Sequence, residues 1–522
     1  MGVYRAEYSS TMDGLTRRNV VCSLTAAVAW SMLRPGKAVA LGSPRFKADP
    51  FALGVASGDP SVDGFVLWTR LVGENLALLD EPELPVGWEV AEDEGFRRIV
   101  TRGGAMAIRD FAHSVHAEVG GLRPGRPYWY RFHAGKAISP TGRTLTVPER
   151  PERLRVALTS CQHWENGYFA AYRDMVAGEP DLIVHAGDYI YESPSHGKAV
   201  RPFGAETPVD LAGYRARHAL YKSDTDLRAA HAAAPWLVTW DDHDVQNDYA
   251  GLVPADGTPT EIFGRRRAAA YQAYFEHMPL RPSAMLGEGG MQMCRRLAWG
   301  GLATFHVLDD RQYRSDQACP MPGRLGVRGG TDCPEIDAEE RTMLGAVQER
   351  WLDEGLAADK ARWTVLAQQT GFSRLDLQPG PGEMISTEGW DGYGAARRRL
   401  TASLRRAAPR NPVFLGGDLH SFWACDVKAD FNDPASPVIA SEFVTSALAG
   451  GKLPPGLYAS GEEHTHIRFS DTTHQGYLRV TFSAAGIEAD IRMIEDQSNP
   501  ASPSHSLQRF VVEDGRPGPR LA

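Results

Sequence analysis

Hydrophobic and polar positions follow two different patterns along the chain, and the change between them lies near Pro148. Before it, short apolar alternations are broken by turn residues, as in Phe65–Thr69, Val115–Val119 and Tyr128–Phe132. This spacing, without any long helical stretch, is typical of short strands in antiparallel sheets. We therefore expect an antiparallel β-sandwich of the fibronectin type over residues 41–148.

After Pro148, strand-like apolar runs alternate with helical stretches at residues 167–176, 210–222, 265–277 and 338–360. Alternation of this kind predicts a layered α/β domain, which we place at residues 149–498. From about Ser498 the chain is rich in proline and serine and then charged. We expect residues 499–522 to form a loosely held C-terminal tail.

The first 40 residues have the pattern of a targeting segment. Arg17 and Arg18 precede a mildly apolar run from Val20 to Leu33, and small residues follow at 38–40. This segment resembles a twin-arginine export signal cleaved after Ala40, which predicts the export machinery as a partner and a periplasmic or secreted location. The alternative is a soluble N-terminal helix whose two arginines are solvated. No stretch reaches the roughly 18 apolar residues of a transmembrane segment.

Composition and charge narrow the class of protein. Of the 522 residues, 43% are hydrophobic and 23% are charged, which is the balance of a soluble globular protein. The formal net charge of -9 argues against a surface that coats nucleic acid, whereas acidic clusters suit cations. Six cysteines are too few for a disulfide framework.

Six apolar runs of the second region each end in a cluster of polar residues. The clusters are residues 159–163, 185–192, 240–244, 309–314, 367–370 and 416–421. Because ligands bind at the carboxyl ends of strands in open α/β sheets, we expect these clusters to meet at one rim. Their acidic, histidine, tyrosine and cysteine side chains predict a metal site with more than one ion.

The residue types indicate which metals would bind. Gly187 and Gly417 allow sharp turns that expose the carboxylates of Asp188 and Asp418, and Tyr191 lies three residues after Asp188. Carboxylates suit hard cations, while a thiolate with a phenolate suits a strongly Lewis-acidic metal such as ferric iron. Two adjacent metals can hold a phosphoryl oxygen and convert a bridging water into hydroxide.

These motifs resemble the metallophosphoesterase superfamily that includes the purple acid phosphatases, and more closely its alkaline phosphatase D (PhoD-like) family. The resemblance rests on Ser160-Cys161-Gln162, the run from Gly187 to Glu192, Trp240–Asp244, Asp309–Arg314 and Gly417–His420. It implies a layered αββα catalytic domain after a β-sandwich, and hydrolysis of phosphate esters at alkaline pH. The implied cofactors are Fe3+ and Ca2+.

Carried over by motif, the resemblance implies that Cys161, Asp188, Tyr191 and His420 hold iron, with Asp188 bridging to calcium. Asp242 and Asp418 are the implied calcium ligands. The motifs leave open the roles of Gln368 and Gln369, and the choice between Asp241 and Asp242.

In the implied mechanism, a metal-activated hydroxide attacks phosphorus in line. We expect His243 to protonate the leaving alkoxide and Arg311 or Arg314 to clamp phosphate oxygens. The alternative for His243 is to orient Asp242 or cap a loop, and for the arginines it is to form structural ion pairs.

Several residues and the substrate class stay open at this stage. Cys319 and Cys333 are expected to form a disulfide in an exported protein, whereas Cys294 and Cys425 are expected to be small buried residues. His464 and His466 fit a solvated loop better than a metal site. Trp390 and Tyr393 either stack on a leaving group or pack their loop.

The motifs do not separate a phosphomonoesterase from a phosphodiesterase or a phospholipase D-like enzyme. The alternative from a different class is a non-catalytic exported binding protein stabilised by calcium.

Overall fold

The structure is a computed structural model that describes residues 46–73, 82–195, 197–287, 289–319, 327–329, 333–378, 380, 384–451 and 464–522. The export signal expected at residues 1–40 lies outside the described residues. In the part of the chain that is described, no helix has the length and apolar character needed to cross a membrane.

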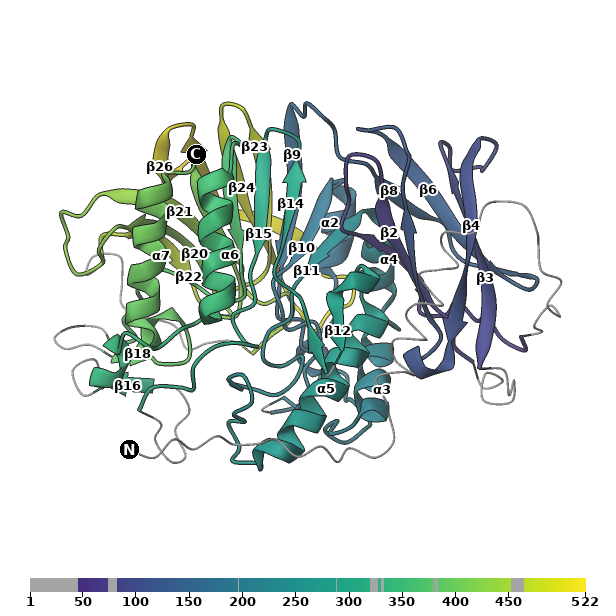
Figure 1. The fold of residues 1–522 in the computed structure, drawn as a ribbon, viewed down its shortest axis with the longest axis horizontal. Coiled ribbons are helices and arrows are strands. Elements are labelled where there is room, and N and C mark those ends of the chain that lie inside the picture. Colours follow the sequence, from purple (N-terminus) through teal and green to yellow (C-terminus); the bar gives the residue numbers. More distant parts are fainter. Residues whose placement is uncertain are drawn as a thin grey trace, which may run out of the picture.

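Two large sheets form the centre of the molecule (Figure 1). The first has ten strands in the spatial order β26 (Arg516–Leu521), β25 (Ser504–Glu513), β24 (Gly486–Ile494), β23 (Gln475–Ser483), β9 (Arg153–Thr159), β10 (Leu182–His185), β11 (Pro235–Val238), β1 (Val55–Gly58), β2 (Phe65–Arg70) and β5 (Ser114–Val119). The second has seven, in the order β14 (Arg295–Trp299), β15 (Ala303–Val307), β17 (Trp363–Ala367), β19 (Pro412–Gly416), β21 (Val438–Val444), β20 (Phe422–Lys428) and β22 (Ile467–Asp471).

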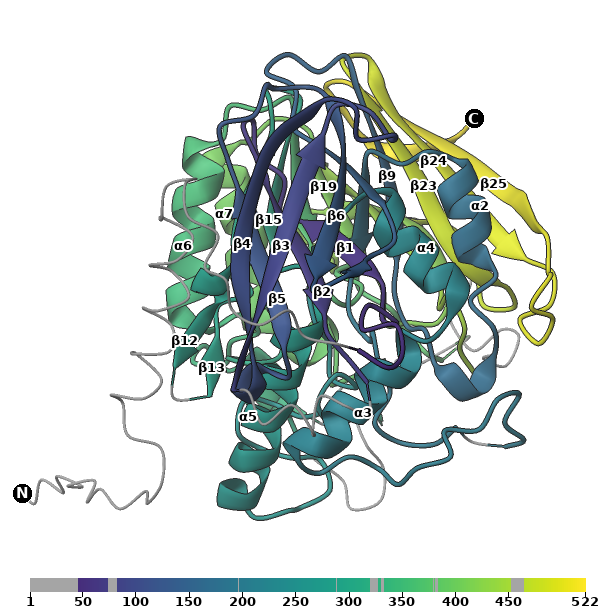
Figure 2. The ribbon, with the colours of Figure 1, turned by 90° about the vertical axis from the view of Figure 1, so that its right-hand side faces the viewer.

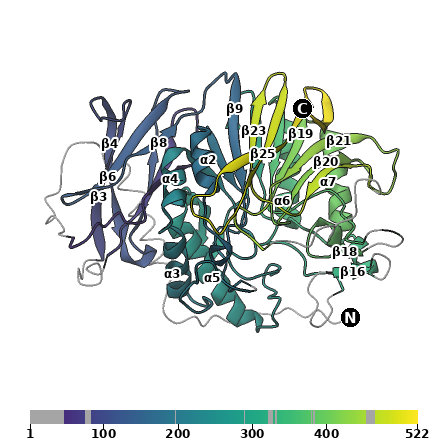
Figure 3. The ribbon, with the colours of Figure 1, turned by 180° about the vertical axis from the view of Figure 1, so that it is seen from behind.

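The other strands of the described residues form three smaller sheets. A five-stranded sheet contains β4 (Ile99–Ile108), β3 (Glu83–Ala91), β6 (Pro127–Ala134), β7 (Ala137–Ile138) and β8 (Gly142–Leu145), the last paired with β6. The two-stranded sheets join β12 (Met285–Gly287) to β13 (Gly290–Met291) and β16 (Val327–Gly329) to β18 (Met384–Ser386). Figure 3 shows the five-stranded sheet at one end of the molecule and the helix α7 (Gly394–Ala407) toward the other.

The remaining helices are α2 (Ala171–Ala177), α3 (Leu211–Tyr221), α4 (Thr225–Ala233), α5 (Thr260–His277) and α6 (Gly345–Ala358). Short 3-10 helices lie at Arg109–Phe111, Trp164–Asn166, Pro282–Ala284, Pro334–Asp337 and Trp390–Gly392. Capping side chains set two of the starts: Asp210 accepts a hydrogen bond from Gly213 N at 2.8 Å before α3, and Asp224 accepts from Asp226 N and Leu227 N before α4.

Apolar side chains fix how these layers stack. The facing sides of the two large sheets share one buried core, to which β9 contributes Leu158 and β15 contributes Phe305. The other face of the first sheet packs under α2, α3, α4 and α5, and the other face of the second packs under α6 and α7. Figure 2 shows this order, with α6 and α7 at one side and α2 and α4 at the other.

The N-terminal strands do not form a separate body. β3 and β6 pack against β2 and β5 around buried Phe65, Val86 and Phe132, but β2 and β5 belong to the ten-stranded sheet. The link is β1, which pairs in parallel with β11 through Gly58 and Trp236. Strand pairing across such a sequence separation leaves no signal in local periodicity.

The expectation of a loosely held tail at residues 499–522 is wrong. Residues 504–521 contain β25 and β26, which extend the ten-stranded sheet beyond β24, and Figure 2 shows β25 beside β24. Phe510 and Val512 are buried in the core between the sheets, with the partly buried Val511 between them. The segment is rich in proline, serine and charge, and neither strand has the regular apolar and polar alternation that would have predicted it from the sequence.

Candidate metal centre

The expected polar clusters meet at one rim because the strands before them run parallel. β9, β10 and β11 are parallel neighbours in the first sheet, as are β15, β17 and β19 in the second. Their carboxyl ends therefore lie at the same edge of each sheet. Among the described residues, this edge brings the predicted ligands of both sheets together in the clusters described below.

The backbone at these strand ends is held in the left-handed region. Cys161, Asp188, Asp418 and His420 have φ values of 54°, 56°, 66° and 49°. Non-glycine residues in this region cost about 1–3 kcal/mol each and occur at sites where the surroundings enforce them. Gly187, at φ 112°, has no room for a side chain, since a Cβ there would lie 2.4 Å from the Asp241 Cβ.

The first cluster contains the four predicted iron ligands. One donor atom from each of Cys161, Asp188 and His420 lies within 4.8 Å of the others. The Tyr191 hydroxyl donates to Asp188 Oδ2 at 2.8 Å and lies 3.0 Å from His420 Nε2. A thiol, a carboxylate, a phenol and an imidazole therefore surround one position.

The second cluster consists only of carboxylates. Asp188, Asp241, Asp242 and Asp418 each place an oxygen within 4.8 Å of the others, so Asp188 belongs to both clusters. The Arg311 guanidinium lies among them: its Nε bonds Asp241, and its Nη2 lies 3.7 Å from Asp242 and 3.8 Å from Asp418. Asp241 thus joins the predicted calcium ligands in space while also pairing with this arginine.

Electrostatics at the two clusters favour a bound cation. Burial and neighbouring charges raise the pKa of Asp188 and Asp241 well above the usual carboxyl range. Burial, reinforced by Asp188, likewise raises the pKa of Cys161 and of Tyr191. A positive ion stabilises the deprotonated form of each group, so the cluster is suited to cations.

His243 is held beside the carboxylates by Glu192. The His243 Nδ1 lies 2.7 Å from Glu192 Oε2, and the His243 backbone N donates to Asp242 Oδ1 at 3.0 Å. Although burial opposes it, the carboxylates of Glu192, Asp242 and Asp188 raise the pKa of His243 well above its usual value. The imidazolium is thus the favoured form, as a proton donor requires. Sequence reasoning missed this role of Glu192, although it lies in the Gly187–Glu192 motif.

Arg311 and Arg314 are both buried and both bind Glu388. Arg314 Nη1 lies 2.8 Å from Glu388 Oε1, an oxygen that Arg311 also contacts. Glu388 further forms a group with Asp242 and Asp248 whose donor atoms lie within 4.8 Å. Both arginines therefore form ion pairs, the role predicted from the sequence as the alternative to binding phosphate. Arg311 Nη2, however, has no hydrogen-bond partner among the described residues. Glu388 comes from a loop that carries no motif, so the sequence offered no signal for it.

Gln368, Gln369, Trp390 and Tyr393, whose roles the sequence left open, make hydrogen bonds and packing contacts within the fold. Gln369 Nε2 donates to Thr239 Oγ1 at 2.7 Å, and Gln368 Oε1 accepts from Trp390 Nε1 at 2.9 Å. Trp390 and Tyr393 are buried and pack their loop.

His464, His466 and the two cysteines Cys294 and Cys425 also lie apart from the proposed metal ligands. His466 Nε2 lies 2.8 Å from the Arg374 carbonyl oxygen, and His464 lies near Asp376. Cys425 is buried as expected, whereas Cys294 is only partly buried.

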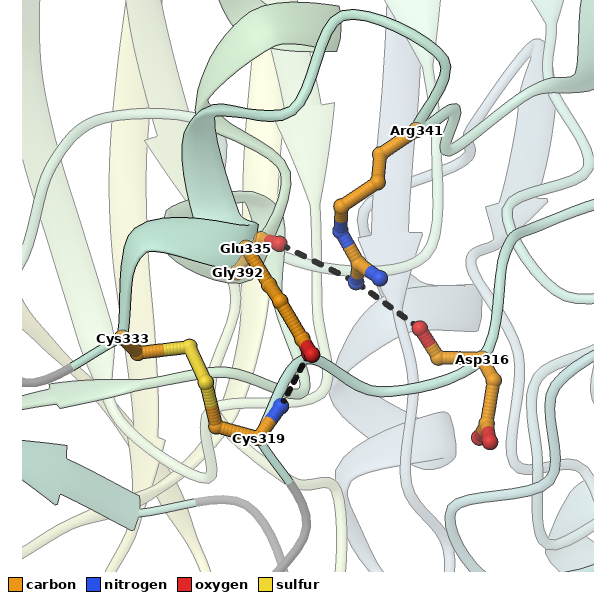
Figure 4. Close-up of a disulfide and its surroundings, with 6 residues drawn as sticks. All are labelled: Asp316, Cys319, Cys333, Glu335, Arg341 and Gly392. Atoms are coloured by element: carbon orange, nitrogen blue, oxygen red, sulfur yellow. Dashed lines mark hydrogen bonds between the residues drawn. A yellow bond between two sulfur atoms is a disulfide. The ribbon is translucent and has the colours of Figure 1, made fainter.

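Cys319 and Cys333 form the expected disulfide, with their Cα atoms 6.0 Å apart. Figure 4 shows its surroundings, where Cys319 N donates to Glu335 and Arg341 donates to the carbonyl oxygen of Asp316 at 2.8 Å. Arg341 also reaches the Gly392 carbonyl oxygen at 3.3 Å. These bonds tie the disulfide to the loop that follows Glu388.

Comparisons with known proteins decide the family. The family model described as "PhoD-like phosphatase" matches residues 156–491, and "PhoD-like phosphatase, N-terminal domain" matches residues 36–148. The chain belongs to the PhoD-like phosphatase family. Alkaline phosphatase D of Bacillus subtilis (strain 168) is 41% identical over 492 residues, which cover 92% of this chain and 83% of that protein.

A solved structure titled "Structure of PhoD" matches this fold with a TM-score of 0.86 and 41% identity. The match covers 92% of this chain and 93% of that one. The resemblance inferred from the motifs is thus confirmed, and this PhoD-like chain is a phosphoric ester hydrolase of mixed α/β fold. Family membership sets aside the non-catalytic binding protein as an alternative.

Proposed function

We propose that this phosphatase is an exported enzyme that hydrolyses phosphomonoesters, phosphodiesters or both at alkaline pH, at a centre containing iron and calcium. The observation that carries the proposal is the position of Asp188 between two donor sets of different chemistry. One set offers sulfur, nitrogen and phenolic oxygen, and the other offers only carboxylate oxygens.

The donors fit the two metals. Cys161, Asp188, Tyr191 and His420 would hold ferric iron, for which thiolate, phenolate and imidazole are suitable ligands. Asp188, Asp242 and Asp418 would hold calcium, which prefers several carboxylate oxygens, and Asp241 is close enough to assist them. When bound, these metals supply Lewis acidity and activate water for attack on phosphorus.

The chain's own residues then complete the chemistry. His243 donates a proton to the leaving alkoxide, and Glu192 holds the imidazole in place through Nδ1. Arg311 directs its unpartnered Nη2 toward the space between Asp242 and Asp418, where it can bind a phosphate oxygen. Glu388 orients Arg311 for this contact.

The proposed division is a signal at residues 1–40, an N-terminal β region at 41–148 whose β1, β2 and β5 continue the ten-stranded sheet, and an αββα catalytic region from 149 onward. The two family models, which meet between residues 148 and 156, support this division. The disulfide between Cys319 and Cys333 supports export, because disulfides persist in oxidising compartments. The twin-arginine machinery and a periplasmic or secreted location follow from the same proposal.

The test is hydrolysis of p-nitrophenyl phosphate and of bis(p-nitrophenyl) phosphate at alkaline pH, with added calcium and with a calcium chelator. The proposal predicts turnover that the chelator abolishes and added calcium restores. The ratio of the two rates assigns the enzyme to monoesters or diesters. Undiminished turnover in the chelator would contradict the calcium role.

A further inference from the structure

Two side chains of α3 hold the backbone at Tyr191 and Glu192. The Arg217 guanidinium donates through Nη1 to the Tyr191 carbonyl oxygen and, at 3.0 Å, to the Glu192 carbonyl oxygen. One helical turn later, the Tyr221 hydroxyl accepts a hydrogen bond from Tyr191 N at 3.0 Å. One helix therefore fixes the segment that bears both a proposed iron ligand and the carboxylate that holds His243.

Arg217 is 3% exposed, and its guanidinium binds the main chain. A third bond runs from Nη2 to the Glu206 carbonyl oxygen at 3.1 Å, and among the described residues Arg217 forms no ion pair with a carboxylate. Burying a charged group is expensive unless hydrogen bonds compensate it. The position of the guanidinium and that of the 191–192 backbone therefore depend on each other.

A series of ring contacts leads from Arg217 to His243 by a second route. The Arg217 Cζ lies 3.6 Å from the centroid of the Phe203 ring, which lies 5.5 Å from that of His163. The centroids of the His163 and Tyr191 rings are 4.4 Å apart, and those of the Tyr191 and His243 rings are 4.2 Å apart. Movement of the guanidinium would therefore reach the His243 imidazole through packed side chains as well as through the backbone.

Glu192 depends on Arg217 more than Tyr191 does. Among the described residues, the bond from Arg217 is the only hydrogen bond to the Glu192 carbonyl oxygen. Tyr191 is held in addition by Tyr221 at its backbone N and by Asp188 at its hydroxyl. Loss of the guanidinium should therefore displace the Glu192 carboxylate, and with it the imidazole that this carboxylate holds, while the phenol keeps its place.

We infer that Arg217 is a positioning residue for proton transfer to the leaving group, acting through Glu192 on His243. The inference rests on the proposed function, in which His243 donates that proton. Displacing a reacting group by about 1 Å can lower the rate by about 10²-fold, so a side chain that does not touch the ester can control kcat. Arg217 lies in a helical stretch predicted from the sequence, where the local pattern gives no sign of this role.

The test measures Arg217→Met on two phosphate monoesters that differ in their leaving group. For n-butyl phosphate we expect kcat to fall by about 10²-fold, because its alkoxide must be protonated as it leaves. For p-nitrophenyl phosphate the fall should be far smaller, because p-nitrophenolate leaves without a proton. KM for both esters and the bound iron should stay unchanged, which a general loss of structure would not give.

A double-variant cycle shows whether Arg217 acts through His243. In a His243→Ala background, Arg217→Met should lower the rate with n-butyl phosphate no further, because the group that it positions is already gone. Arg70→Met is the matched control, since Arg70 is partly buried, its Nε donates to the Ala112 carbonyl oxygen at 3.0 Å, and it lies outside the donor clusters. This control should leave the ratio of the two ester rates unchanged.

Arg217→Lys carries the test if Arg217→Met does not fold. A lysine keeps the charge but lacks the planar fork that reaches several carbonyl oxygens, so it should show a smaller loss with the same dependence on the ester. Equal losses on the two esters, or losses that add to those of His243→Ala, would overturn the inference and leave the proposed function intact. If His243→Ala itself lowers both rates equally, the proposed proton donor fails, and the inference fails with it.

Discussion

Cys161 distinguishes one donor cluster from the other at the scale of single residues. Among the described residues, its sulfur is the only soft donor beside Asp188 and His420, whereas the adjoining cluster contains carboxylates alone. Its backbone φ of 54° and its near-complete burial show that the fold places the side chain there at a conformational cost.

Cys161→Ser should therefore lose iron while keeping the fold. Mutating a residue that only hydrogen-bonds a metal ligand typically lowers metal affinity about 10- to 100-fold. Replacing the ligand itself should lower bound iron by at least this factor, with a parallel fall in kcat. Elemental analysis and circular dichroism measure the two effects. Cys425→Ser is the matched control, because Cys425 is equally buried and lies outside both clusters. Equal iron in both variants would mean that Cys161 is not a ligand.

His243 makes a second prediction at this scale. A proton donor matters most when the leaving group is a poor one, so the effect of His243→Ala should depend on the ester. For n-butyl phosphate we expect kcat to fall by about 10²- to 10⁴-fold, and for p-nitrophenyl phosphate by far less. Phosphate release measures both rates. Equal losses on the two esters would instead assign His243 to supporting Asp242.

Among the elements, the disulfide secures the loop that carries Glu388. Cys319 and Cys333 are 14 residues apart, and β16, which lies between them, pairs with β18 just before Glu388. The double variant Cys319→Ser with Cys333→Ser should lower the free energy of unfolding by about 3 kcal/mol, the value expected for a loop of this length. Urea unfolding of the two proteins gives the difference. An unchanged midpoint would mean that the loop is held by its other contacts.

The helical layer over the first sheet buries basic groups. Lys222 at the end of α3 lies 3.3 Å from His231 of α4, and His218 of α3 stacks on His277 of α5. Burial lowers the pKa of Lys222 and of all three histidines well below their usual values. The native layer therefore contains these groups in their neutral form.

Stability should consequently fall on acidification. Since the folded pKa values are lowered, the unfolded chain binds protons first. The cost of the neutral Lys222 begins below the unfolded lysine pKa of about 10.4, and the further loss from the histidines begins below the unfolded histidine pKa of about 6.5. Below about pH 6.5, each histidine lowers the free energy of unfolding by about 1.4 kcal/mol per pH unit. Urea unfolding at about pH 8 and about pH 5.5 measures this loss.

Lys222→Met should raise the unfolding temperature, because the neutral amine is buried without a carboxylate partner among the described residues. The exposed Lys136→Met is the control and should change stability by at most about 0.5 kcal/mol. A lower unfolding temperature for Lys222→Met than for the control would show that the contact with His231 stabilises the layer.

Over the whole molecule, the sequence predicted what depends on local pattern. The helices α2, α3, α5 and α6 and the rim of strand ends follow from runs of a few neighbouring positions, as do the predictions for Asp188, Tyr191 and His420, whereas α4 and α7 were not among the predicted helical stretches. Glu388 and the pairing of β1 with β11 could not be predicted, because each depends on contacts between segments far apart in the chain. The C-terminal strands were missed because their sequences are rich in proline, serine and charge and lack a regular apolar and polar alternation.

The centre also joins the two large sheets. Cys161 and Asp188 follow strands of the first sheet, whereas Asp418 and His420 follow β19 of the second. The proposed iron and calcium sites therefore exist only when both sheets have formed and packed together. Metal binding and global folding are coupled on this account.

The most direct test is a crystal structure of the metal-loaded protein with anomalous diffraction recorded on both sides of the iron absorption edge. The account predicts an iron peak between Cys161, Asp188, Tyr191 and His420, and calcium density shared by Asp188, Asp242 and Asp418. Iron among the carboxylates alone, or no iron in active protein, would contradict it.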